Sequence, residues 1–166
     1  MTKIEQLNKD TIDVVHHLAH EIWPDTFKDI LSKDQIVYML DWMYDLGTLR
    51  DQVQVGHLYY VLKEYNTPVG FIGLEPNYPD AGQLRIHKLY VLPDTQGKGF
   101  GRELMNKAID VAFDVDLESI HLNVNKFNKS VEFYKHVGFK VIGEEDIDIG
   151  KGYLMEDFIM QLDLKS

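Results

Sequence analysis

Apolar residues in the first part of the chain recur at helical spacing. After a short strand expected near Ile4, residues 12–22 place an apolar side chain at every third or fourth position. This spacing predicts an amphipathic helix. Asp10 is expected to be its N-cap, and the helix is expected to end near Pro24, because proline removes a backbone donor and restricts the residue before it.

A second helix is expected directly after Ser32. Ser32 and Gln35 have the spacing of a capping box, in which the serine side chain accepts a hydrogen bond from the first turn. The apolar positions that follow share one helical face. They are Ile36, Met39, Leu40 and Met43.

The hydrophobic period changes to that of strands at residue 57. The apolar runs 57–62 and 69–74 flank a turn at 66–68 and predict a β-hairpin. A third strand is expected from 84 to 92, and Pro93 ends it. Strict alternation along this strand places one set of side chains on each face. The sets are Leu84, Ile86, Lys88 and Tyr90 on one face, and Arg85, His87, Leu89 and Val91 on the other.

The second half of the chain combines helices and strands. The expected elements are a helix at 102–115, a strand at 120–124, a helix at 130–137 closed by Gly138, and a hairpin of 140–149 and 154–164. Helices, a meander and a βαβ-type unit in this order predict the α+β class, or α/β with a mixed sheet. The length favours a single domain over residues 1–166.

Composition narrows the classes of function. There is no cysteine, which excludes disulfides and thiolate chemistry and suits a cytoplasmic protein. No apolar run reaches the roughly 20 residues of a membrane span, and no signal peptide is recognisable, so no membrane partner is expected. The formal charge is −10, which disfavours nucleic acid and suits a cationic partner.

A glycine-rich loop carries the clearest chemical signal. Gly97, Gly99 and Gly101 alternate between the strand that Pro93 ends and a helix expected to begin near Arg102. The free N–H groups of a helix N-terminus, with glycines that let the backbone approach, form an anion site. A P-loop is excluded by spacing, and a dinucleotide fingerprint would need glycine at position 102.

Two motifs together resemble the GNAT superfamily of N-acetyltransferases. The first is Gln96-Gly97-Lys98-Gly99-Phe100-Gly101 after a strand and before a helix. The second is Asn125, Asn128, Ser130, Phe133-Tyr134 and Gly138-Phe139, in the expected order and distance. The resemblance implies a twisted mixed sheet of about seven strands with helices on both faces. It also implies that the strands 84–92 and 120–125 splay apart around the pantetheine of acetyl-CoA.

The resemblance further implies which residues bind this co-substrate, with no metal required. Main-chain groups of Leu89, Tyr90 and Val91 would pair with pantetheine. Gln96, Gly97, Lys98, Gly99, Phe100, Gly101 and Arg102 would hold the pyrophosphate, and Asn128 would touch the cofactor arm. Tyr134 would point at the sulfur.

Transfer of an acetyl group to an amine needs both an acid and a base. An alkyl amine has a pKa near ~10.4 and must lose a proton before it attacks, and the leaving thiolate must gain one. The resemblance gives the acid as Tyr134. The base is expected to be His87, with Glu75 or a chain of water molecules as alternatives.

Three histidines on the first helix, His16, His17 and His20, have some likeness to a metal site. The surrounding amphipathic pattern and the place of Glu21 do not fit such a site, so no metal is expected there. These histidines are instead expected to line or flank the acceptor groove.

The acceptor pocket is less clearly marked in the sequence. The resemblance implies that the first two helices and the last hairpin shape it, which makes its candidate residues Trp23, Phe27, Trp42, Tyr78 and Tyr153. The chain resembles the branch that acetylates spermidine and spermine in Thr26-Phe27, Leu89-Tyr90-Val91, Gln96-Gly97-Lys98-Gly99 and the tail Asp157-Phe158-Ile159-Met160. The acidic charge suits a polyamine, whereas His87 and Arg85 depart from that branch. Protein N-termini, lysines and aminated antibiotics are alternative acceptors. A non-catalytic acetyl-CoA sensor is the alternative function, and a homodimer is compatible with the family.

Overall fold

A single mixed sheet organises the chain. The computed structural model describes residues 1–95 and 97–164. In chain order the elements are β1 (Thr2–Gln6), α1 (Asp13–Thr26), α2 (Lys33–Met43), α3 (Leu46–Gln54), β2 (Leu58–Glu64), β3 (Thr67–Pro76), β4 (Gln83–Val91), a short 3-10 turn η1 (Pro93–Thr95), α4 (Phe100–Asp114), β5 (Ser119–Asn125), α5 (Ser130–Val137), β6 (Lys140–Gly150) and β7 (Tyr153–Asp163). The strand order is β1-β2-β3-β4-β5-β7-β6, and only β4 and β5 pair in parallel.

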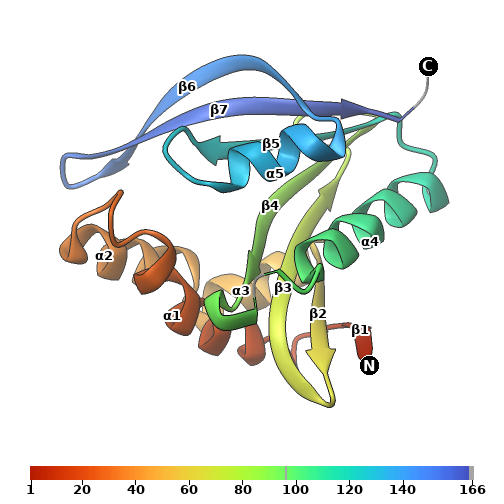
Figure 1. Cartoon of the computed structure of the whole chain (residues 1–166), viewed down its shortest axis with the longest axis horizontal. Helices are drawn as coiled ribbons and strands as arrows, with labels where there is room; N and C mark the ends of the chain where they lie inside the picture. The colour runs from red at the N-terminus through yellow and green to blue at the C-terminus, as the bar shows by residue number, and fades with distance from the viewer. Residues whose placement is uncertain (96, 165–166) are drawn as a thin grey trace.

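Helices cover both faces of this sheet, as expected. Figure 1 shows α1, α2 and α3 on one side of β3 and β4, with α4 on the other. Each side has its own hydrophobic core: Trp23, Tyr44 and Phe71 belong to the core under α1–α3, while Leu104 and Tyr134 belong to the core under α4 and α5. No helix in the described part of the chain is long and apolar enough to span a membrane.

The first two helices form where the pattern predicts them, but their ends differ. The Ser32 side chain accepts a hydrogen bond from the Gln35 amide at 3.1 Å, which confirms the predicted N-cap of α2. The prediction of Asp10 as the cap of α1 is wrong, because the helix begins after Ile12 without a side-chain cap. Helix α1 also continues through Pro24 to Thr26, since the Phe27 amide still donates to Trp23 O at 3.0 Å.

Helix α3 was not expected from the sequence. Its segment is mostly polar, and Leu49 is its only buried residue, so it carries no apolar stripe. Asp45 caps it by accepting a hydrogen bond from the Thr48 amide at 3.2 Å. The following hairpin turns at Tyr65 and Asn66, which have positive φ, one residue earlier than the predicted turn.

A β-bulge in β4 overturns the strict alternation predicted for that strand. Gly73 and Leu74 of β3 are consecutive, but they pair with Lys88 and Ile86, so His87 is an extra residue. Two side chains in succession can then face one side. Ile86 and Leu89 both pack into the core under α4, whereas Lys88 packs against Tyr44 and Tyr59 on the opposite side.

The two parallel strands separate half-way along their length. Pairing between β4 and β5 runs from Gln83–Ser119 to Ile86–Leu122 and stops there, although β4 continues to Val91 and β5 to Asn125. This is the splay that the family resemblance implied. Beyond Ile86, the edge of β4 that faces β5 has no strand partner among the described residues.

Candidate active site

Two cavities meet in the gap between β4 and β5. The larger has a volume of about 610 Å³ and extends to the glycine loop and α4. The smaller, of about 240 Å³, lies between β4, β5, α1, α2 and the β6–β7 hairpin. Five residues line both cavities, namely Leu89, Tyr90, Asn128, Ser130 and Tyr134. We call these five residues the shared wall.

The glycine loop has the backbone geometry of an anion site. Gly97 and Gly99 have φ values of 89° and 79°, which L side chains rarely adopt, and a Cβ built on either would meet no atom within 4 Å. The N-terminal hydrogen bond of α4 runs from the Glu103 amide to Gly99 O at 3.1 Å. The amides of Phe100, Gly101 and Arg102 therefore precede the helical ladder and are free for a ligand.

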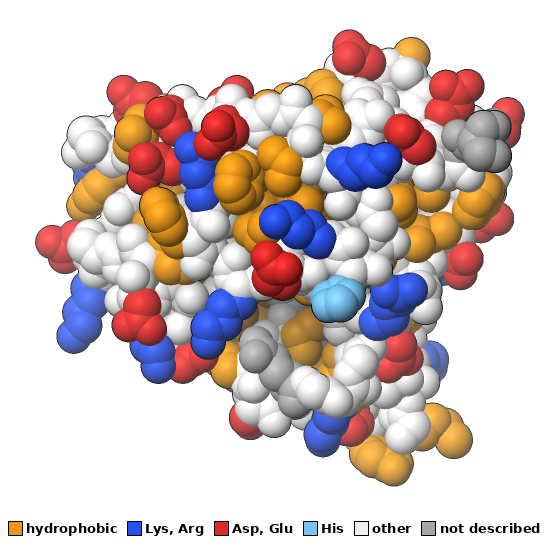
Figure 2. All heavy atoms as spheres, turned by 45° about the horizontal axis from the view of Figure 1, so that its top comes forward, with side chains coloured by type: hydrophobic (Ala, Val, Ile, Leu, Met, Phe, Trp, Pro, Cys, Tyr) orange, Lys and Arg blue, Asp and Glu red, His pale blue; other side chains and the backbone are white. Residues whose placement is uncertain are grey.

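Basic side chains around this loop are arranged differently from the expectation. Arg102, which was expected at the pyrophosphate, lines the larger cavity, and so do Lys28 and Lys129, which the motif did not indicate. The Lys98 amine instead lies 3.4 Å from the Glu64 carboxylate and does not line the cavity. Gln96 lies outside the described residues. Figure 2 shows basic side chains interleaved with acidic ones on one face, so negative charge is not evenly distributed over the surface.

The expected pantetheine-binding residues all border the larger cavity. Leu89, Tyr90 and Val91 line it from the unpaired edge of β4. Asn128 lines it from the turn before α5, where its Oδ1 accepts a hydrogen bond from the Ser130 amide at 2.9 Å. That bond fixes the side chain and leaves its Nδ2 group available to a ligand.

Tyr134 lies on the shared wall with its ring held from two sides. Phe133 and Phe139 pack against it edge-on, at centroid distances of 5.4 and 5.6 Å. Only 6% of the residue is exposed. Burial raises the pKa of Tyr134, so its hydroxyl keeps its proton at every physiological pH.

His87 lies in a cluster of three groups that the bulge brings together. Its Nε2 is 2.9 Å from Glu75 Oε1, and His57 Nε2 is 3.3 Å from the same oxygen. The two imidazole rings are nearly parallel, with centroids 5.0 Å apart. Burial lowers the pKa of His87, and the hydrogen bond that His87 donates to Glu75 opposes that effect. His87 is therefore neutral at pH 7, with Nε2 occupied by Glu75 and no hydrogen bond to Nδ1 among the described residues.

This cluster has the composition of a metal site but an unfavourable electrostatic setting. The three potential ligand atoms lie within 4.8 Å of one another. The positive charges of Arg85 and Lys88 both act on His87 and lower its pKa, and they oppose a further cation in the same way. His57 had no signal in the sequence, because the bulge and the start of β2 bring it to His87 only in the folded chain.

The histidines of α1 do not line either cavity. His16 Nδ1 is 2.7 Å from Tyr44 O, and His20 Nδ1 is 2.7 Å from His16 O. The first contact joins α1 to the end of α2, and the second lies within α1. They therefore do not line the acceptor groove, whose wall on this side is formed by Trp23 and Phe27, and a place flanking it stays a prediction.

Lys88 is a buried amine that the sequence did not mark as special. It is 4% exposed, and burial lowers its pKa to about 7. Its Nζ donates to Tyr59 Oη at 2.5 Å and to Gln52 Oε1 at 3.1 Å, and it lies 5.2 Å from the centres of the Tyr44 and Tyr59 rings. An ionisable residue on an otherwise apolar strand face was the available signal.

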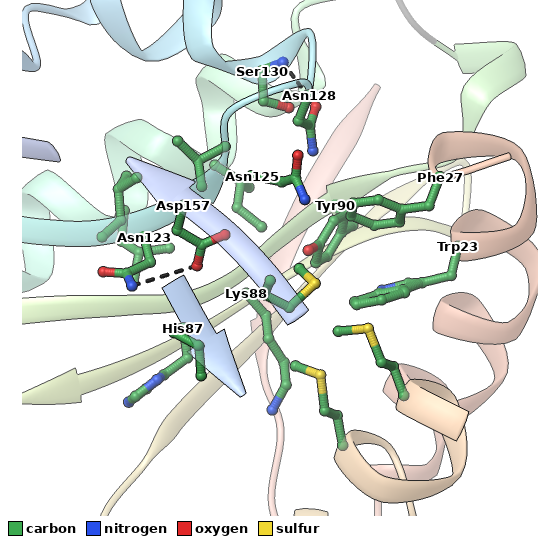
Figure 3. A pocket seen from close by; sticks show the side chains of 18 of the residues that line it. Trp23, Phe27, His87, Lys88, Tyr90, Asn123, Asn125, Asn128, Ser130 and Asp157 are labelled. Carbon is green, nitrogen blue, oxygen red and sulfur yellow. Dashed lines mark hydrogen bonds between the residues drawn. The ribbon is translucent and has the colours of Figure 1, made fainter. Parts of the chain in front are cut away.

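The smaller cavity has aromatic and sulfur-containing walls with a few polar groups. Trp23, Phe27 and Trp42, three of the acceptor candidates, line it, and their contact with an acceptor stays a prediction. Tyr78 and Tyr153 do not: Tyr78 lies beside His87 with ring centroids 5.5 Å apart, and Tyr153 packs on Tyr38. Figure 3 shows Trp23 and Phe27 on one side of this cavity, with Asp157, hydrogen-bonded to Asn123, on the other.

A mixed sheet whose parallel central strands separate over a glycine-rich helix N-terminus defines the N-acetyltransferase fold class. The chain belongs to the Acetyltransferase (GNAT) family, whose sequence model matches residues 13–139. This finding confirms the family resemblance carried by the two motifs.

Relatives of known name support the same family. The chain is similar to the peptidyl-lysine N-acetyltransferase YjaB of Escherichia coli, with 38% identity over 98 residues, covering 58% of each chain. It is similar to the spermidine N(1)-acetyltransferase of Vibrio cholerae, with 35% identity over 75 residues, covering 44% of this chain and 38% of the relative. The chain thus spans less than two thirds of the length of these curated relatives.

A solved structure matches almost the whole chain. The PaiA N-acetyltransferase of Thermoplasma acidophilum, in complex with coenzyme A, superposes with a TM-score of 0.82 at 25% identity. The superposition covers 98% of this chain and 99% of that one. It confirms the predicted fold class, including the seven-stranded mixed sheet.

Proposed function

We propose that this protein transfers the acetyl group of acetyl-CoA directly to a small primary amine. The observation that carries the proposal is the shared wall, where a cavity suited to the cofactor meets a second, smaller cavity at Tyr134. A direct transfer needs both substrates at one point. The chain has no cysteine that could carry the acetyl group as a covalent intermediate.

The larger cavity fits acetyl-CoA by the chemistry of its walls. The positive φ of Gly97 and Gly99 and the empty space beside them leave room for a pyrophosphate at the first amides of α4. Arg102, Lys28 and Lys129 supply positive charge around that space. The open edge of β4 offers main-chain groups to the two amides of pantetheine. Once bound, acetyl-CoA supplies an activated thioester.

Tyr134 is proposed as the general acid. Its high pKa keeps the hydroxyl protonated, so it can donate to the sulfur as negative charge develops there. A donor of this kind stabilises the departing thiolate mainly by its hydrogen bond, because its own conjugate base is unfavourable in this buried position.

His87 is proposed as the base. Glu75 accepts a hydrogen bond from Nε2–H, which assigns the tautomer that leaves the Nδ1 lone pair free. A neutral imidazole with a free nitrogen can take the proton from the acceptor ammonium. Glu75 then acts as a positioning residue, as the carboxylate does beside the histidine in other catalytic triads.

Release of free thiol from acetyl-CoA tests the proposal. Spermidine, spermine, short diamines, an aminoglycoside and a lysine-containing peptide are the acceptors, and Tyr134→Phe is assayed alongside. Amine-dependent thiol release that is slow in the variant supports direct transfer with this acid. Tight binding of CoA without release on any acceptor would favour a sensor of acetyl-CoA.

We propose that the acceptor is a polyamine in preference to a protein lysine. The acidic net charge and the small, aromatic-lined cavity support a slender cation. A cytoplasmic location and a homodimer also remain predictions, which cell fractionation and light scattering would test.

A further inference from the structure

The smaller cavity contains a carboxylate whose bonding capacity is not used within the protein. Asp157 on β7 lines this cavity and is only 6% exposed. Asn123 Nδ2 donates to its Oδ2 at 3.4 Å, and its Oδ1 has no hydrogen-bond partner among the described residues. A buried carboxylate left with an unused acceptor is costly, so its partner is expected to come from outside the chain.

The nearest basic residue does not neutralise Asp157. Arg85 acts on it through space, but no ion pair joins the two within the described residues, and Arg85 directs one guanidinium nitrogen to His121 Nδ1 at 2.9 Å. Burial raises the pKa of Asp157, and the negative charges of Glu145 and Asp146 raise it further. The local field therefore favours a cation at this wall of the cavity.

The carboxylate is placed to reach a ligand in the cavity. Figure 3 shows Asp157 facing the space that Trp23 and Phe27 border from the opposite side. The terminal torsion of an aspartate is broad and roughly two-fold, so either oxygen can turn toward that space at little cost. Aromatic walls opposite a carboxylate suit an ammonium with an aliphatic stem.

Asp157 lines the smaller cavity but is absent from the shared wall. The amine that reacts must be neutral and must lie at the shared wall, near Tyr134. An ammonium that stays charged at Asp157 is then a different group of the same acceptor. We propose that Asp157 anchors a second, positively charged amine, so that the preferred acceptors are short aliphatic diamines and longer polyamines. This assignment rests on the proposed transfer to an amine.

Matched acceptors isolate the second charge. We compare kcat/KM for 1,5-diaminopentane, 5-amino-1-pentanol and n-hexylamine, which have similar length and one reacting amine in common. The protein is expected to favour the diamine by about tenfold or more, in line with one hydrogen bond to a charged group. Equal use of the three amines by the unchanged protein would overturn the anchor and leave the proposed transfer intact.

Asp157→Asn tests the residue itself. The asparagine keeps the shape and removes the charge, so it is expected to abolish the preference for the diamine over n-hexylamine. Asp163→Asn is the control, because Asp163 also lies on β7 and accepts a hydrogen bond, from Gln161 Nε2 at 2.9 Å, but is exposed and does not line the cavity. It should keep the preference. An unchanged preference in Asp157→Asn, with a normal thermal unfolding midpoint, would contradict the proposal.

A binding measurement separates failure of the anchor from failure of the transfer. If no acceptor releases thiol, the proposed function is wrong for these amines. Calorimetry of CoA-saturated protein with 1,5-diaminopentane and with 5-amino-1-pentanol then tests the anchor alone. Tighter binding of the diamine that Asp157→Asn removes supports it, and equal binding of both compounds overturns it. Should Asp157→Asn unfold, Asp157→Glu replaces it, with a preference shifted to 1,4-diaminobutane as the supporting result.

Discussion

The two cavities are built in different ways, although they share a wall. The loop that faces the larger cavity is one short segment, 97–102, in which the backbone provides the binding groups. The smaller cavity is built from side chains of α1, α2, β4, β5, β6 and β7. A site made of backbone needs glycines at fixed spacing, so it leaves a motif. A site made of distant side chains leaves none.

The largest expected effect is at the shared wall, whose residues belong to both cavities. Tyr134→Phe removes the proposed proton donor to the departing thiolate, and kcat is expected to fall by about 10²-fold or more. The phenyl ring still packs between Phe133 and Phe139, so the KM values for acetyl-CoA and amine should change little. Steady-state kinetics with each substrate varied checks this. A variant with normal kcat would exclude Tyr134 as the acid.

A change in the glycine loop should affect only the cofactor side. Gly99→Val forces a branched side chain into a left-handed conformation, at a cost of roughly 1–2 kcal/mol, and fills the space beside the helix N-terminus. The dissociation constant of CoA is expected to rise about tenfold, while the KM of the amine stays the same.

Gly152→Val is the matched control for that change. Gly152 has the same φ of 79° and the same empty surroundings, but it lies in the β6–β7 turn, away from the larger cavity. Both variants should lose similar stability, and only Gly99→Val should lose affinity for CoA, as measured by calorimetry. Equal loss of affinity in the two would mean that backbone strain, and not the site, determines the result.

Glu75→Gln sharpens the comparison from the acceptor side. The hydrogen bond to the Glu75 carboxylate raises the pKa of His87, so the loss of that charge should lower the pKa further. The acid limb of the kcat profile should then move to lower pH. The maximal rate should fall several-fold, since a weaker base also takes protons less readily. A pH series at saturating acetyl-CoA measures both. An unmoved acid limb would remove the Glu75–His87 pair from the mechanism.

The smallest expected effect concerns stability at Lys88. Its pKa of about 7 in the folded chain lies below its value of ~10.4 in the unfolded chain. Its burial therefore costs stability fully below pH 7, and the cost is relieved as pH rises from 7 toward 10. Lys88→Met should raise the free energy of unfolding by about 1–3 kcal/mol at pH 6.5, because Tyr59 and Gln52 still bond each other.

Urea unfolding at pH 6.5 and pH 9 checks this sign. The gain from Lys88→Met should shrink at the higher pH. Lys140→Met is the control, since Lys140 is exposed and should show no such dependence on pH. A gain that grows with pH would contradict the account of Lys88.

The sequence predicts this fold better than it predicts the acceptor cavity, and the reasons are physical. Hydrophobic period and the two motifs locate most strands and helices, the glycine loop and Tyr134. Helix α3 is missed because a single buried leucine gives no stripe. The bulge is missed because an extra residue in a strand depends on pairing with β3 and leaves the residue types unchanged.

The candidate site divides along the same line. The family resemblance made Trp23, Phe27 and Trp42 acceptor candidates, and all three line the smaller cavity. Asp157 was noted only as part of a tail that resembles the polyamine-acetylating branch, and His57 only as part of a strand. Neither was given a role, because each meets its neighbours only through strand pairing over a long stretch of chain. Lys98 was expected at the phosphates, but its amine lies beside the carboxylate of Glu64 at the end of β2. That neighbour is distant in the sequence and could not be predicted from it.

The bulge at His87 has a consequence for how this protein can change over evolution or in the laboratory. The extra residue changes the face to which the later side chains of β4 point, so Ile86 and Leu89 lie on one face and Lys88 on the other. Of the two cavities, Arg85 before the bulge lines only the smaller, whereas Val91 after it lines only the larger. Position 85, which is not the proposed base, is therefore a target for a library that seeks new acceptors without a change on the cofactor side.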